Sequence, residues 1–482
     1  MEKAFTVAAV DAQNRQTHAL IAKMAASMGQ LRHEFETLQK SCQDVVTVAS
    51  EDPATRAART RHAASRSNLT AQLRELFGDE NASFRGRSQM SAMQCVIEAY
   101  SNLLYIAPTG GGKSLLFNLA AFIENKCTIV VSPLVSLRQD MLRNTIELGM
   151  TAAVWDQETT ASTAALPVVL IVQYECALSD DFLAFARARV GRGDIRRFVF
   201  DEAHLYLTDQ SYRPSMERVY QLTQFGVPSI LMTATLPLTK EDALLALFRL
   251  VRADTEVMRD STLRTDLHLA VQSITRRESR TVDLVDVVAA RLNVYKAGDK
   301  AIVFCLRTDT ADELAALFEE EHEGSATRAF SLHAKKSERE RSTILSAFAS
   351  HEGNAVIFGT HCLSCGVNIK TVRDVIFWGL PDSIEHFLQG AGRAGRDLAG
   401  GTVTIFADRN DRCDDPRLKQ WALIGAGCRR SELSCRIDGF SEDCKPDVNG
   451  WAPCDRCYDP AVSRLKHPPL PRLGKYSLIL AD

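Results

Sequence analysis

Several features that mark membrane and secreted proteins are missing from this sequence. No apolar run approaches the roughly 20 residues that a membrane-spanning helix needs. The N-terminus, MEKAFTVAAVDAQNRQ, lacks the apolar core of a signal peptide. The cysteines number 13, and an odd count argues against a fully paired disulfide framework. We therefore expect an intracellular protein with no membrane partner, located in the nucleus if its host is eukaryotic.

The sequence also lacks a charge excess, an internal repeat and a low-complexity tract. Its formal net charge is −3 over 482 residues, of which 45% are hydrophobic and 24% charged. This composition is ordinary for a globular protein and creates no global basic field for nucleic acid, although a local basic groove is compatible with it. Because the length exceeds what one hydrophobic core supports, we expect two or three domains.

Segment 1–80 has a pattern of its own. Eight apolar residues recur in steps of three and four, which predicts an amphipathic helix, and a polar, arginine-rich linker follows. Two interpretations are open: a coiled-coil seam for a partner helix, or a face that packs on the rest of the chain. The apolar positions are Ile21, Met24, Met28, Leu31, Phe35, Leu38, Cys42 and Val45.

From residue 81 onward, short apolar runs alternate with helix-like stretches. One series lies in 81–258 and a second in 259–411, before a cysteine-rich segment, 412–482. Continuous apolar runs are typical of parallel strands buried on both faces. The pattern predicts an α/β fold with two tandem domains, each built on a parallel sheet. The runs are NLLYIA, CTIVVSP, PVVLIVQ, RRFVFDEAH and PSILMTAT, then KAIVFCL, RAFSLHA, NAVIFGT, RDVIFWGL and GTVTIFA.

The stretch APTGGGKS lies between the first apolar run and a predicted helix, and has P-loop spacing with Ala107 in place of the first glycine. Glycines allow backbone N–H groups to approach phosphates closely, whereas the simpler alternative is a flexible strand-to-helix turn. Lys113 is expected to reach the β- and γ-phosphates and Ser114 to bind Mg²⁺. The expected nucleotide-binding residues of this loop are Thr109, Gly110, Gly111, Gly112, Lys113 and Ser114.

The second motif, DEAH, is acidic and follows the buried run FVF. Two carboxylates at the end of a buried strand are costly unless they bind something. We expect Asp201 to hold Mg²⁺ and Glu202 to orient and deprotonate the attacking water. The alternative is an acidic first turn of a helix. Both motifs at strand ends favour nucleotide hydrolysis.

The third motif is FLQGAGRAGRD, at the far end of the second series. Gln389, Arg393 and Arg396 place one amide and two guanidinium groups on one short segment. If the two sheets face each other, these arginines meet the γ-phosphate and stabilise the charge of the transferring phosphoryl group. Such a site works only when the domains close, which is the cycle of a motor.

Residues 84–409 resemble the two RecA-like domains of a superfamily 2 helicase, and of the RecQ family in particular. The resemblance rests on the order of FRGRSQ, APTGGGKS, VVSPLVSLRQD, DEAH, MTATL, IFGTHCLSCGVN and QGAGRAGRD, which ends in Asp397. It implies an ATP-dependent 3′-to-5′ helicase that acts on single-stranded and on tailed or branched duplex DNA. It also implies that Gln89 reads adenine, with Gln94 as a competing choice.

The same resemblance implies which residues contact nucleic acid. Thr233 and Thr235 of MTATL are expected to couple hydrolysis to the strand. The aromatic-rich loop that follows DEAH in RecQ proteins is here LYLTDQSYRPSM, without tryptophan. Its tyrosines either stack on bases or pack on the sheet edge, so DNA-stimulated hydrolysis is in question. The expected contacts are Ser132, Pro133, Tyr206, Tyr212, Arg213, Thr233, Thr235 and Thr360.

The cysteine-rich segment is similar to the RecQ zinc-binding segment. Its expected Zn²⁺ ligands are Cys428, Cys444, Cys454 and Cys457. Cys435 is an alternative to Cys444, and unliganded buried thiols are the other possibility. Only about 25 residues follow Cys457, too few for the winged-helix domain of many RecQ proteins, so we expect a truncated or minimal relative.

Two competing hypotheses remain beside the DNA helicase. One is an RNA-dependent ATPase of the same superfamily, against which Asp397 and the cysteine segment argue. The other is a non-catalytic nucleic-acid-binding relic, against which the intact Lys113, Glu202 and both arginines argue.

Overall fold

The computed structural model describes residues 68–98, 101–133, 135–155, 165–209, 213–274, 281–364, 369–397, 399–445 and 450–458. These residues belong to one compact unit, Arg61–Asp482. The helix predicted around residues 21–45 lies outside the described residues. Within them, no helix is both long and apolar enough to cross a bilayer.

The first lobe is built on a seven-stranded parallel sheet with the strand order β3-β4-β2-β5-β6-β1-β7. Its central strands are continuous apolar runs, because side chains on both faces are buried. The strands are β1 (Asn102–Ile106), β2 (Cys127–Ser132), β3 (Ala152–Val154), β4 (Val169–Gln173), β5 (Ile195–Phe200), β6 (Ser229–Thr233) and β7 (Thr255–Arg259).

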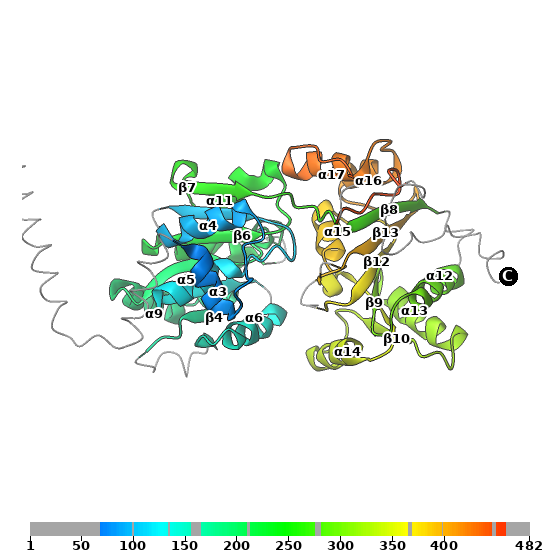
Figure 1. The fold of residues 1–482 in the computed structure, drawn as a ribbon, viewed down its shortest axis with the longest axis horizontal. Coiled ribbons are helices and arrows are strands. Elements are labelled where there is room, and N and C mark those ends of the chain that lie inside the picture. The colour runs from blue at the N-terminus through cyan, green and yellow to red at the C-terminus, as the bar shows by residue number, and fades with distance from the viewer. Residues whose placement is uncertain are drawn as a thin grey trace, which may run out of the picture. The chain divides into compact units, whose positions relative to one another are not determined.

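Helices cover both faces of this sheet (Figure 1). Along β1, Leu103 and Tyr105 join one core with α3, α4 and α5, whereas Leu104 and Ile106 join the opposite core with α9 and α11. This alternation follows from the two-residue period of a strand. The helices are α3 (Leu69–Phe77), α4 (Arg87–Glu98), α5 (Leu115–Glu124), α6 (Val135–Glu147), α8 (Tyr174–Ala177), α9 (Asp180–Gly191), α10 (Leu205–Thr208) and α11 (Glu241–Leu247), with 3-10 segments η1 (Pro214–Phe225), η2 (Leu238–Lys240) and η3 (Arg252–Asp254).

The second lobe carries a six-stranded parallel sheet with the order β10-β11-β9-β12-β13-β8. Helices α12 and α13 cover one face, and α15 and α16 pack in the core on the other (Figure 1). The elements are β8 (Leu267–Ser273), α12 (Thr281–Val294), β9 (Lys300–Cys305), α13 (Thr308–Glu321), β10 (Arg328–Leu332), α14 (Glu338–Ser350), β11 (Ala355–Gly359), η4 (His361–Ser364), β12 (Val372–Trp378), α15 (Ile384–Ala391), β13 (Gly401–Ala407), α16 (Pro416–Leu423) and α17 (Arg429–Asp438).

These two parallel sheets confirm the predicted pair of α/β domains. Two strands of the first sheet, β3 and β7, were not among the predicted runs, because one has three residues and the other, TEVMR, is largely polar. The chain passes from one sheet to the other between Arg259 and Leu267. Helix α3, within the predicted extension 1–80, buries Leu69, Leu73 and Leu76 in the core of the first lobe.

The cysteine-rich segment follows the outer edge of the second sheet. The backbone N–H groups of Ala452 and Asp455 donate to the carbonyls of Thr265 and Leu269, beside and within edge strand β8. The Asp455 carboxylate also accepts from the backbone N–H of Val271 (3.0 Å). This pairing covers a strand edge that would otherwise expose unpaired backbone groups.

Candidate nucleotide site

The glycine loop connects β1 to α5. Gly110 and Gly112 have φ angles of 79° and 77°, a region that residues with a Cβ rarely adopt. The Lys113 ammonium donates to the carbonyls of Ala107 (3.1 Å) and Pro108 (3.2 Å), so it lies folded against its own loop. Ser114 is exposed at the start of α5 and its side chain caps no backbone group. The helix N-terminus is therefore open to an anion.

Gln89 lies directly against this loop. Its amide nitrogen donates to the carbonyls of Gly111 (3.3 Å) and Gly112 (3.0 Å), and its oxygen accepts from the backbone N–H of Arg85 (2.8 Å). Gln94, the competing choice, is exposed elsewhere on α4. The geometry favours Gln89 over Gln94 as the side chain that senses a nucleotide.

The acidic pair follows β5 at the same edge of the sheet. Burial and the negative charge of Glu202 together raise the pKa of Asp201 to about 7, while Lys113 opposes the shift. Glu202 has a φ of 44°, and a non-glycine residue in this region carries strain of about 1–3 kcal/mol. One buried carboxylate oxygen of Glu202 has no hydrogen-bond partner among the described residues. Strain and an unused acceptor are typical of a functional carboxylate.

A hydrogen-bond relay links this acidic segment to the second lobe. The Gln389 amide nitrogen lies 2.7 Å from His204 Nε2, and His204 Nδ1 lies 2.8 Å from the Thr233 hydroxyl. Burial lowers the pKa of His204, so the ring is neutral. A neutral ring that accepts from Gln389 donates from Nδ1 to Thr233. The same hydroxyl accepts from the backbone N–H of Thr235 (3.3 Å). The relay thus joins three of the sequence motifs.

The arginine segment approaches the glycine loop. A Cβ added at Gly392 would lie 2.7 Å from the Thr109 side chain, so only glycine permits this approach. Burial and the charge of Arg393 together lower the pKa of Arg396 to about 9, whereas Glu202 opposes the shift. The pKa of Lys113 is likewise lowered by burial and by the charge of Arg396. Arg396 therefore lies within electrostatic range of groups on the other sheet.

Further contacts hold the two lobes in this arrangement. Lys240, the last residue of η2, pairs with Glu385 on α15 at 2.7 Å. Arg264 donates to the carbonyls of Ala394 and Gly395, both at 2.5 Å. The arginine segment is therefore braced from the first lobe and from the connection between the sheets.

Asp397 has a partner within its own lobe. Its carboxylate forms a two-point ion pair with Arg373, with N–O distances of 2.8 and 2.5 Å. Arg373 also pairs with Asp299 at 3.1 Å. The residue that ends the sixth motif thus anchors this segment to the second sheet.

The expected nucleic-acid contacts are mostly buried. Of the two alternatives for the tyrosines, Tyr206 has the packed one, because it is 0% exposed and packs against Phe200 and Phe248. Ser132, Pro133, Thr233 and Thr235 are also buried. Arg213 and Thr360 are half-buried, and Tyr212 lies outside the described residues.

Arg213 is nevertheless well placed. Its guanidinium donates to the carbonyl of Pro133 (3.0 Å) and lies 5.6 Å from the ring centroid of Tyr174. It therefore joins the ends of β2 and β4 at the edge where α/β sheets bind ligands. Of the predicted contacts that the structure describes, Arg213 and Thr360 are the two with partly exposed side chains.

Four cysteine sulfurs converge in the C-terminal segment. Those of Cys428, Cys444, Cys454 and Cys457 all lie within 4.8 Å of one another, and Cys428 is 3.6 Å from Cys444. A tetrahedral Zn²⁺ with Zn–S bonds of about 2.3 Å separates its sulfurs by about 3.8 Å. The set therefore fits a closed thiolate site. Cys435 is exposed on α17 and outside the cluster, so it does not replace Cys444.

Sequence reasoning missed the residues that bring the lobes together. His204 stands in the DEAH motif, but its partner Gln389 is 185 residues away. Arg264 and the Lys240–Glu385 pair belong to no motif. Gly392 lay inside the quoted segment, directly before Arg393, and a glycine at that place was the available signal for a close backbone approach.

Two family profiles match this chain. Residues 87–244 match the profile described as DEAD/DEAH box helicase, and residues 283–397 match the helicase conserved C-terminal domain. The two matches lie on the first and second lobes, respectively, in the order of a two-lobed helicase.

Curated relatives carry RecQ-type names. ATP-dependent DNA helicase Q-like 4B of Arabidopsis thaliana is 28% identical over 386 residues, covering 77% of this chain and 32% of the relative. RecQ-like DNA helicase BLM of Xenopus laevis is 28% identical over 337 residues, covering 66% of this chain and 24% of the relative. The chain thus spans about a third or less of the length of these two relatives.

Solved structures share the fold. Mycobacterium smegmatis helicase Lhr bound to ssDNA and AMP-PNP has a TM-score of 0.56 at 21% identity, covering 78% of this chain and 51% of that chain. S. cerevisiae Dbp5 bound to RNA and ADP BeF3 has a TM-score of 0.51 at 17% identity, covering 70% and 87%. At these identities the likeness establishes two tandem RecA-like lobes. Both helicase profiles lie in order on the two lobes, and the curated relatives carry RecQ-type names, so the chain is similar to the RecQ family of helicases.

Proposed function

We propose that this chain hydrolyses ATP to move 3′ to 5′ along single-stranded DNA and to open tailed or branched duplexes. The observation that carries the proposal is the approach of the arginine segment to the first lobe. Gly392 lies against Thr109 of the glycine loop, and the Gln389 amide lies 2.7 Å from His204 of the acidic segment. A cation from one lobe beside the loop lysine and the acid of the other is the arrangement that phosphoryl transfer between two lobes requires.

The residues of the first lobe take distinct roles in this proposal. The backbone N–H groups of the loop from Thr109 to Gly112 and the start of α5 hold the phosphates. Lys113 exchanges its present carbonyl partners for phosphate oxygens, and Gln89 senses the base. Ser114 and Asp201 hold Mg²⁺, which neutralises charge between the phosphates when bound. Glu202, with a buried oxygen that accepts no hydrogen bond from the described residues, orients the attacking water and accepts its proton.

The second lobe supplies charge and coupling. Arg396, with Arg393 beside it, stabilises the transferring phosphoryl group. Gln389 acts through His204, because its amide contacts the ring rather than the glycine loop. His204 also contacts Thr233, and its Nδ1 lies 3.6 Å from the Glu202 carboxylate. A shift of Thr233 on DNA binding would therefore move His204 relative to Glu202.

The cysteine segment is a structural Zn²⁺ site in this proposal. The four sulfurs have the spacing of a closed tetrahedral set, which leaves no position open for a substrate. The segment covers edge strand β8, so its folding supports the second lobe. Single-stranded DNA is the proposed partner because the relatives are named DNA helicases. The N-terminal helix remains a proposed site for a coiled-coil partner, and nuclear residence remains a proposal for a eukaryotic host.

A strand-displacement assay tests the proposal. Duplexes with 3′ and 5′ tails are incubated with ATP and Mg²⁺, and the Lys113→Ala variant serves as the control. We expect the wild type alone to separate the strands of the 3′-tailed duplex.

Phosphate release measured with RNA and with DNA separates the alternatives. Stronger stimulation of hydrolysis by RNA than by DNA would favour the RNA-dependent ATPase. ATP bound without phosphate release would favour the non-catalytic relic.

A further inference from the structure

Helix α17 connects the cysteine cluster to the first lobe. It begins directly after Cys428, one of the four clustered cysteines, and ends at Asp438, followed by Gly439 with a φ of 79°. A Cβ at Gly439 would lie 2.5 Å from the end of the Leu238 side chain, in segment η2 of the first lobe. One end of this helix is thus fixed beside the sulfurs and the other against η2.

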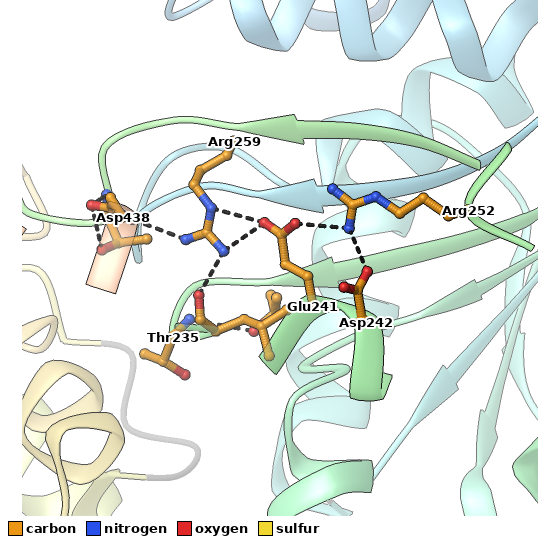
Figure 2. A network of polar contacts seen from close by, with 9 residues as sticks. Thr235, Glu241, Asp242, Arg252, Arg259 and Asp438 are labelled. Atoms are coloured by element: carbon orange, nitrogen blue, oxygen red, sulfur yellow. Dashed lines mark hydrogen bonds and ion pairs between the residues drawn. The ribbon is translucent and has the colours of Figure 1, made fainter. Parts of the chain in front are cut away.

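The Asp438 carboxylate is fully buried and has three partners at the junction between the sheets. It pairs with Arg259 at 3.0 Å and accepts from the backbone N–H (2.9 Å) and hydroxyl (3.0 Å) of Thr262. Figure 2 shows Arg259 between Asp438 and Glu241. Nearby, the Ser261 hydroxyl donates to Glu442 at 2.7 Å. The cysteine segment therefore holds the connection between the lobes from two points.

Arg259 connects Asp438 to the segment next to Thr235, at the end of the hydrogen-bond relay from Gln389. It pairs with Glu241 at 2.9 Å and donates to the carbonyl of Leu236 at 2.8 Å. Leu236 follows Thr235, the end of the relay that starts at Gln389. The Arg259 and Glu241 side chains are 10% and 4% exposed. Breaking one partner of a buried pair leaves an uncompensated charge.

The same network reaches the other end of the relay. Glu241 begins α11, and its neighbour Lys240 pairs with Glu385 on α15. Glu385 lies four residues, one helical turn, before Gln389. The contacts of Arg259 therefore converge on both the Thr235 end and the Gln389 end of one hydrogen-bonded path.

We propose that Arg259 and Asp438 are positioning residues for DNA-stimulated hydrolysis. They hold the segment Leu236–Glu241 against α17. The position of the cysteine segment therefore affects whether Thr235 and Gln389 keep their places at the two ends of the relay through His204. The proposal rests on the proposed function. It assigns to the cysteine segment a role in coupling, in addition to the folding of its own lobe.

The central variant is Asp438→Asn, which keeps the size and an oxygen acceptor for Thr262 but removes the charge that faces Arg259. We expect the DNA-stimulated kcat to fall at least fivefold, while the basal rate and the KM for ATP stay within twofold. The double variant Arg259→Gln/Asp438→Asn should lose less DNA-stimulated kcat than the product of the two single losses. The reason is that each single change already breaks the same ion pair.

Two control variants remove neighbouring contacts but leave the Arg259–Asp438 and Arg259–Glu241 pairs in place. Arg436→Gln lies on the same helix but contacts the Arg417 carbonyl and Gln420 within the C-terminal segment. Arg252→Gln removes the half-exposed partner of Glu241 and Asp242. Both controls should keep the wild-type stimulation. Equal loss in Arg436→Gln and Asp438→Asn would overturn the proposal, as would full stimulation in Asp438→Asn.

Hydrogen–deuterium exchange gives a readout that needs no hydrolysis. Asp438→Asn should speed exchange at Thr262 and across Leu236–Glu241, whereas Arg436→Gln should not. Faster exchange at Thr262 alone would mean that Asp438 stabilises only its own hydrogen bonds to Thr262, and it would contradict the positioning role. If the wild type hydrolyses no ATP, the proposed function fails. Unchanged exchange across Leu236–Glu241 in Asp438→Asn would separately refute the positioning role of Asp438.

Discussion

The two lobes contribute to the candidate site in different ways. In the first lobe, the lysine and the acidic pair stand at the ends of strands of one sheet, and Lys113 contacts carbonyls five and six residues away. In the second lobe, the arginine segment follows one short helix, and Gln389 finds its partner 185 residues away. The chemical groups are thus encoded locally, while their alignment depends on contacts between distant parts of the chain.

This difference predicts two classes of variant. Changes in the first lobe should remove binding and chemistry together, because the loop both holds the phosphates and stabilises their charge. Changes in the second lobe should spare nucleotide binding and reduce the rate of the chemical step. The predictions below test this division.

The largest effect is expected for Lys113→Ala. Loss of a charged donor at a desolvated phosphate site should lower kcat/KM for ATP by at least about 10³-fold. Phosphate release measured against ATP concentration checks this. Lys126→Ala, a lysine in the turn after α5, provides the matched control and should behave as wild type. Near-normal hydrolysis by Lys113→Ala would remove the glycine loop from the site.

A smaller effect is expected for Gln389→Ala. The variant breaks the relay to His204 without touching the glycine loop, so we expect roughly a tenfold loss of DNA-stimulated kcat, the cost of about one buried hydrogen bond. The affinity for nucleotide, measured by fluorescence titration, should not change. A parallel tenfold rise in KM would place Gln389 in nucleotide binding instead.

The smallest expected effect is the release of protons when Mg·ADP binds. Because burial raises the pKa of Asp201 to about 7, this carboxyl is protonated below that pH and must lose its proton to hold Mg²⁺. Binding of Mg·ADP at pH 7 should release about half a proton from a group at its pKa. Calorimetry in two buffers of different ionisation enthalpy measures this release, and Asp201→Asn should remove it.

The same shift has a consequence for stability. An acid with a raised folded-state pKa binds its proton more tightly in the folded state, so its stabilising contribution is present at low pH. The unfolding free energy should therefore decrease from about pH 4 to about pH 7 by the contribution of this group. Denaturant unfolding of the wild type and Asp201→Asn over that range provides the comparison, and identical pH slopes would contradict the assignment.

Much of the fold was predictable because parallel strands leave continuous apolar runs. Strands such as β2 and β9 are entirely buried and were predicted by that signal. β7 was not, since TEVMR acquires its place through pairing with β1. The glycine loop and DEAH were predictable because their chemistry is compact in sequence.

The rest of the site required coordinates. The burial of Tyr206 depends on Phe200 and Phe248, which come from different elements. Arg259 and Asp438 lie 179 residues apart and neither belongs to a motif. The four cysteines were predictable as a set, but the exclusion of Cys435 followed from its place on the exposed side of α17.

The central claim is that the arginine from the second lobe completes a nucleotide site held by the first. Single-turnover hydrolysis by Arg396→Ala at saturating ATP tests it most directly. The account predicts a rate about 10³-fold below wild type, the lower range for an arginine that stabilises phosphoryl transfer, with ATP affinity unchanged within a few-fold. Hydrolysis at the wild-type rate would contradict it.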